Sequence, residues 1–95
     1  MQNYSTEQLE QVKELASLFF TPREIAIMME WDAQLFTNDC EIVGNPAYES
    51  FYAGRLQAEV DLRKGILKMA KAGSSPAQTM AMELLKQSTL KMLNR

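Results

Sequence analysis

Residues 19–36 read FFTPREIAIMMEWDAQLF, and this stretch predicts two short helices joined by a tight turn. Thr21 can cap the first helix, Pro22 suits its first position, and Glu24 completes a capping box. The second helix is expected over Ala33–Ile42. Two helices joined in this way are typical of a helix-turn-helix, although a plain helical hairpin in a small bundle produces the same pattern.

The same start signals recur along the chain. Ser5 and Gln8 form a capping box before a first helix, and the longest helix is expected over Pro46–Lys71. Ser75 is expected to cap a last helix that runs to about Met92. No stretch alternates as a strand would, so the fold class is all-α with five helices. We divide the chain into a helix-turn-helix part, residues 1–44, and a long-helix hairpin for oligomerisation, residues 45–95, within one compact domain.

Composition excludes most catalytic and metal chemistry. The 95 residues include no histidine and one cysteine, Cys40, which removes Ser-His-Asp triads and zinc sites of the Cys/His type. We therefore expect no catalytic, cofactor-binding or metal-binding residues and no enzyme activity. No apolar run approaches the roughly 20 residues of a membrane span, and the N-terminus does not resemble a signal peptide. The expected location is the cytoplasm.

Charge is divided unevenly along the chain. Residues 1–49 hold two basic and nine acidic side chains, a formal net charge of −7. Residues 50–95 hold eight basic and three acidic side chains, a formal net charge of +5. Such asymmetry indicates either a polyanionic partner for the basic half or head-to-tail contact between subunits.

The helix expected over Ala33–Ile42 carries amide and hydroxyl groups that can pair with base edges. It has no basic residue, however, and its acidic Asp39 and Glu41 would repel phosphates. Glu30 occupies the turn position where a positive φ favours glycine. Lysines on the long helix can supply phosphate contacts instead, although polar faces of this kind are also common without a ligand. The DNA-contact candidates are Gln34, Thr37, Asn38, Lys64, Lys68 and Lys71.

Apolar residues cover more than half the circumference of the long helix. A helix on the surface of a monomer needs a stripe only slightly wider than about 100°. The excess predicts a second burial partner, a homo-oligomer. Charged residues spaced four positions apart along this apolar surface can pair with one another. These pairs are either exposed to solvent or part of a subunit interface, where they would set the register of the two helices. The oligomer-interface candidates are Phe51, Tyr52, Arg55, Leu56, Glu59, Leu62, Arg63 and Ile66.

Two segments, FFTPREIAIMMEW and NPAYESFYAGRLQAEVDLRKGILKMAKAGSSPAQTMAMELLKQ, resemble phage and prophage proteins of the small terminase subunit type. The resemblance spans about residues 19–87, including Phe51–Arg55, Leu62–Lys64 and Ala70–Pro76. It implies a non-catalytic protein of phage DNA packaging that binds double-stranded DNA, assembles into multimers and hands DNA to a large terminase subunit in the bacterial host cytoplasm. The alternative is a protein-binding adaptor or antitoxin-like regulator whose acidic N-terminal half docks a basic partner.

Overall fold

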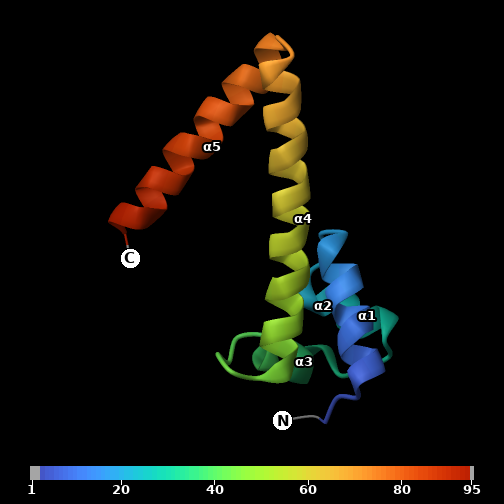
Figure 1. Ribbon diagram of the computed structural model, residues 1–95. Coiled ribbons are helices and arrows are strands. Elements are labelled where there is room, and N and C mark those ends of the chain that lie inside the picture. The colour runs from blue at the N-terminus through green and yellow to red at the C-terminus, as the bar shows by residue number, and fades with distance from the viewer. Residues whose placement is uncertain (1–2, 95) are drawn as a thin grey trace. The chain divides into compact units, whose positions relative to one another are not determined.

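The computed structural model describes residues 3–94, and within them α-helix is the only regular secondary structure (Figure 1). This confirms the prediction of an all-α protein with five helices. None of the described helices is both long and apolar enough to cross a membrane. The helices are α1 (Thr6–Ser17), α2 (Pro22–Met28), α3 (Ala33–Asp39), α4 (Pro46–Lys71) and α5 (Ser75–Leu93).

Both predicted capping boxes are present. The Ser5 hydroxyl accepts from the Gln8 amide at 3.1 Å, and the Gln8 side chain accepts from the Ser5 amide at 2.9 Å. The Thr21 hydroxyl accepts from the Glu24 amide at 3.2 Å, and the Glu24 carboxylate accepts from the Thr21 amide at 2.9 Å. Each box satisfies two backbone N–H groups that the helix itself leaves without a partner.

Two predicted boundaries are wrong by a few residues. α3 ends at Asp39 rather than Ile42. The amides of Glu41 and Ile42 instead donate to carbonyls three residues earlier, which tightens the chain into turns. At α5 the capping residue is Ser74 rather than Ser75, because the Ser74 hydroxyl accepts from the Ala77 amide at 3.3 Å.

Three helices end in a residue with left-handed backbone: Phe19 after α1, Glu30 after α2 and Gly73 after α4, with φ of 70°, 61° and 101°. In each case two backbone N–H groups that follow the helix donate to carbonyls in its last turns. One example is the Trp31 N–H, which donates to the Ala26 carbonyl at 2.9 Å. The positive φ expected at Glu30 is therefore present. Only Gly73 adopts this conformation without steric cost, since glycine has no Cβ.

The chain divides into two compact units, with the boundary between Glu59 and Val60 inside α4. We call residues up to Glu59 the first unit and those from Val60 the second unit. The division inferred from sequence, after residue 44, differs because the first half of α4 supplies Ala47, Phe51 and Ala58 to buried positions of the first unit. The two units are described separately below.

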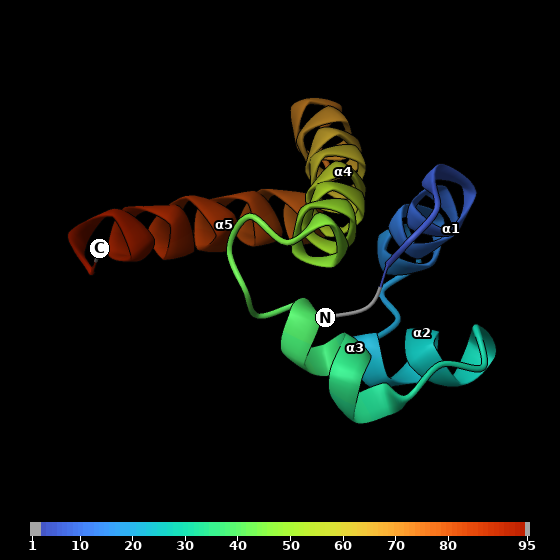
Figure 2. The ribbon, with the colours of Figure 1, turned by 90° about the horizontal axis from the view of Figure 1, so that it is seen from below.

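The core of the first unit is built where α1, α2, α3 and α4 meet. In this unit α2 and α3 lie against each other (Figure 2). α4 also approaches α1 closely at Gly54, where an added Cβ would lie 2.0 Å from the Lys13 carbonyl oxygen. The buried cluster consists of Val12, Ala16, Ile25, Ala26, Phe36, Cys40, Ala47 and Phe51.

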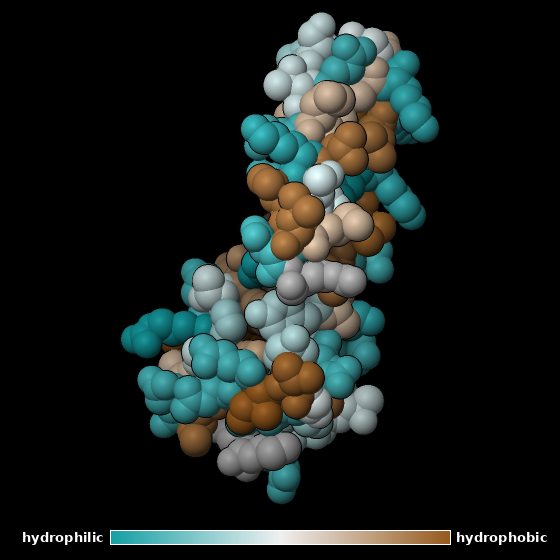
Figure 3. All heavy atoms as spheres, turned by 90° about the vertical axis from the view of Figure 1, so that its left-hand side faces the viewer, coloured by the Kyte–Doolittle hydropathy of each residue, from teal (hydrophilic) through white to brown (hydrophobic). Residues whose placement is uncertain are grey.

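The second unit consists of the last turns of α4 and the whole of α5. Among its described residues, Ile66 and Ala77 are the only buried apolar side chains. Hydrophobic side chains therefore reach the surface among hydrophilic ones (Figure 3, upper part). The exposed large apolar residues of this unit are Val60, Leu62, Leu67, Met69, Met80, Met82, Leu85, Leu90, Met92 and Leu93.

Candidate nucleic-acid interface

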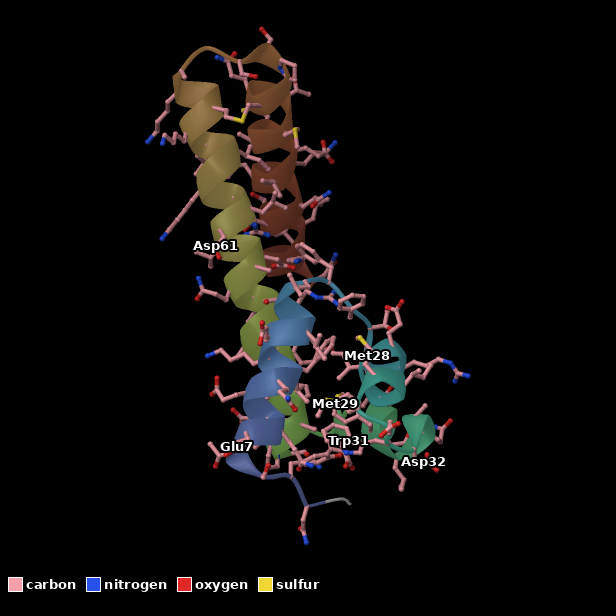
Figure 4. All side chains as sticks on the ribbon, turned by 90° about the vertical axis from the view of Figure 1, so that its right-hand side faces the viewer. Glu7, Met28, Met29, Trp31, Asp32 and Asp61 are labelled. Carbon is pink, nitrogen blue, oxygen red and sulfur yellow. The ribbon has the colours of Figure 1, made fainter. Side chains whose placement is uncertain are left out.

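An aromatic cluster fixes the α2–turn–α3 pair. Trp31 lies at the turn that leads into α3 (Figure 4), and its ring centroid is 5.3 Å from that of Phe36. The Tyr4 ring packs edge-on against both, at 5.2 Å from Trp31 and 6.1 Å from Phe36. Such tilted and edge-on arrangements are the favourable ones for aromatic rings. The cluster holds α2 and α3 against each other.

Asp39, which sequence analysis expected to repel phosphates, is directed inward. Its carboxylate accepts a hydrogen bond from the Tyr4 hydroxyl at 2.5 Å, and the residue is only 3% exposed. Burial, followed by the neighbouring Asp39 carboxylate, raises the pKa of the Tyr4 hydroxyl above its usual range. Asp39 therefore does not lie on the exposed surface of α3, although it still counts toward the net charge of −7 on residues 1–59. Because Tyr4 and Asp39 are far apart in sequence, no local pattern indicates their pairing.

The face of α3 that carries Gln34 and Asn38 is polar and uncharged. The Gln34 side-chain amide donates to the Asn38 amide oxygen at 3.0 Å, and both residues are exposed. Thr37 is half-buried, and the acidic Glu41 lies beyond the end of the helix. The structure thus brings two of the three α3 candidates together as a pair of amides whose remaining donors and acceptors face solvent.

The lysine candidates lie on α4 in the second unit. Lys64, Lys68 and Lys71 are all exposed, and their spacing of four and three residues places them along one side of the helix.

The uneven distribution of charge along the chain follows the boundary between the two units. Residues 1–59 hold three basic and ten acidic side chains, a net charge of −7, whereas residues 60–95 hold seven basic and two acidic side chains, a net charge of +5.

Three oligomer-interface candidates make contacts within the chain. Phe51 and Ile66 are buried. The Arg55 guanidinium donates to the carbonyls of Phe20 at 3.1 Å and Ala16 at 3.4 Å, and lies 5.2 Å from the Phe51 ring centroid. Arg55 thus caps the C-terminus of α1. The other candidates are the exposed Tyr52, Leu56 and Leu62 and the half-buried Glu59 and Arg63.

The single thiol offers no reactive group. Cys40 is buried, and burial, followed by the charges of Asp39 and Glu41, raises the pKa of its thiol to about 12. A thiol must ionise to become a nucleophile, so this one stays protonated near neutral pH.

Comparisons with protein-family models, with curated proteins and with solved structures find no match to this chain.

Proposed function

We propose that this chain is a non-catalytic DNA-binding and assembly protein of the small terminase subunit type, acting in phage DNA packaging. The observation that supports this most directly is the α2–turn–α3 pair, in which Gln34 and Asn38 form an exposed, uncharged amide pair. Amide groups of this kind pair with purine and pyrimidine edges. Asp39 faces inward, so its side chain does not occupy the surface through which the two amides would contact bases.

In this proposal the two units have different tasks. The first unit supplies base contacts through α3, and the second supplies phosphate contacts through Lys64, Lys68 and Lys71. The net charge of +5 on residues 60–95 favours a polyanion there. The proposed partners are double-stranded DNA and a large terminase subunit, in the cytoplasm of a bacterial host. The catalytic steps of packaging would belong to that partner.

The DNA proposal predicts a steep dependence of binding on salt. Affinity for double-stranded DNA should fall strongly between about 50 and 200 mM salt, because phosphate binding releases counterions. Substituting Lys64, Lys68 and Lys71 by alanine together should make the slope of log affinity against log salt less steep by about 3, since each contact contributes about 0.9. Fluorescence anisotropy with a labelled duplex measures both quantities.

Lys13→Ala is the matched control, because Lys13 is an exposed lysine of the acidic first unit. It should leave the slope unchanged. A slope that is flat in the native chain, or equally steep in the triple variant, contradicts the proposed phosphate contacts.

We also propose that copies of the chain associate through the exposed apolar side of α4, where Tyr52 and Leu56 are 44% and 56% exposed. Apolar side chains of this size are stabilised when a partner removes them from water. Light scattering at micromolar concentration should give a mass that is a multiple of 10.8 kDa. Leu56→Glu should shift this mass toward that of one chain, whereas a native mass of 10.8 kDa contradicts self-association.

The second candidate function is a protein-binding adaptor or antitoxin-like regulator. The net charge of −7 on residues 1–59 favours it, since an acidic surface attracts basic proteins. The anisotropy titration separates the two candidates. An adaptor of this kind shows no duplex binding at low salt but binds a basic polypeptide such as polylysine through its first unit.

A further inference from the structure

An apolar groove lies between α4 and α5 within the second unit. It has a volume of about 420 Å³, and its apolar lining consists of Leu67 from α4 and Ala81, Met82, Leu84 and Leu85 from α5. Three of these side chains are strongly exposed: Leu67 at 48%, Met82 at 67% and Leu85 at 62%. Exposed apolar side chains gathered in a groove are typical of a surface that binds a partner.

Lysines flank this groove on both helices. Lys64 and Lys71 lie three residues before and four residues after Leu67, so they share its side of α4. Lys86 lies four residues after Met82 on α5 and therefore stands beside it. All three lysines are exposed. Asp61, one of the two acidic residues of the unit, lines a different groove.

We propose that this groove binds an amphipathic helix of a partner protein, with acidic residues along both edges of its apolar face. The apolar lining buries the partner's apolar stripe, as in other helix-in-groove complexes, and the lysines attract its carboxylates. Methionine suits such a surface because its flexible, polarisable side chain adapts to different shapes. The lining of α5 from Ala81 to Ser88 extends about 11 Å, which matches two turns of a bound helix.

The charge of the unit favours this occupant over two others. A second copy that docked through its own second unit would bring another net charge of +5 against the groove, and like charges oppose association. Docking of a second copy through its acidic first unit is the outcome that the self-association measurement below tests. DNA would satisfy the lysines but not the apolar lining, because its phosphates are strongly hydrated and charged. The inference does not depend on DNA binding by α3.

The test uses the full chain and a synthetic, fluorescein-labelled helical peptide of about 14 residues. Its leucines are spaced three and four residues apart, and glutamates flank them on both sides. The comparison peptide carries lysine at every glutamate position. In an anisotropy titration, the acidic peptide should bind at least about tenfold more tightly than the basic one. Lys71→Glu combined with Lys86→Glu should reverse this preference.

Two single variants test the apolar lining. Met82→Ser should weaken binding of the acidic peptide by about tenfold or more, whereas Met80→Ser should not, because Met80 lines the other groove. Both side chains are exposed on α5, so neither variant should alter helicity measured by circular dichroism. Equal affinity for the two peptides, or equal effects of the two variants, overturns the proposal. A loss of self-association in Met82→Ser without peptide also overturns it, since the occupant is then a second copy.

Discussion

Gly54→Ala should destabilise the first unit by about 3 kcal/mol, the upper part of the range for overpacked sites. A Cβ at this position would lie 2.0 Å from the Lys13 carbonyl oxygen and 2.9 Å from its carbonyl carbon. Both atoms belong to the backbone of α1, so a side-chain rotation cannot relieve the clash. The two helices must move apart, which opens the buried cluster around Val12 and Ala16. Thermal unfolding followed by circular dichroism measures the loss.

Gly65→Ala is the matched control on the same helix. Apart from its chain neighbours and the backbone of its own helix, no atom lies within 4 Å of a Cβ built at Gly65. Alanine should therefore raise the free energy of unfolding by about 0.5–1 kcal/mol, since glycine inside a helix is less favourable by that amount. If both variants shift Tm in the same direction, the close approach of α1 and α4 at Gly54 is wrong.

The helix starts could be predicted from sequence because capping is local. The boxes at Ser5 and Thr21 involve residues three positions apart, so the pattern is complete within one turn. The bounds of α4 were predictable for the same reason, since Pro46 begins it and Gly73 closes its end. The end of α3 was less predictable, because it lacks a glycine or proline until Gly44 and instead changes gradually into turns.

Contacts between distant segments could not be predicted in this way. The charge of Asp39 suggested that it would repel DNA phosphates from the third helix, yet its side chain is buried and accepts a hydrogen bond from the Tyr4 hydroxyl. Arg55 was placed in a charge ladder by its spacing, yet it donates to carbonyls at the end of α1. Both cases involve a charged group whose partner comes from another element. Helical periodicity indicates which residues share a face but not what covers that face.

These contacts change the interpretation of the candidate site more than that of the fold. Sequence alone indicates an acidic third helix that would repel DNA. With Asp39 buried and Glu41 beyond the helix end, α3 exposes the neutral amides of Gln34 and Asn38. The first unit still has an overall charge of −7, to which Asp39 contributes, and this charge opposes DNA binding over a longer range that salt shortens.

Phe36→Ala should lower the free energy of unfolding of the first unit by about 3–5 kcal/mol at 25 °C. Phe36 is fully buried and in ring contact with Trp31 and Tyr4. Replacing a buried phenylalanine by alanine costs about 3–5 kcal/mol, because transfer energy is lost and a cavity remains. A unit of this size has a total stability of only about 3–9 kcal/mol. The substitution therefore removes a large part of what holds α3 against α2.

Leu35→Ala is the control for this prediction, because Leu35 is the preceding residue on α3 and is 43% exposed. Its removal should change the free energy of unfolding by no more than about 0.5 kcal/mol, as for most surface substitutions. Urea unfolding followed by Trp31 fluorescence compares the two variants at the cluster itself. A similar small loss for both would mean that Phe36 does not anchor α3. The α2–turn–α3 pair would then lack the rigid support that DNA reading through Gln34 and Asn38 requires.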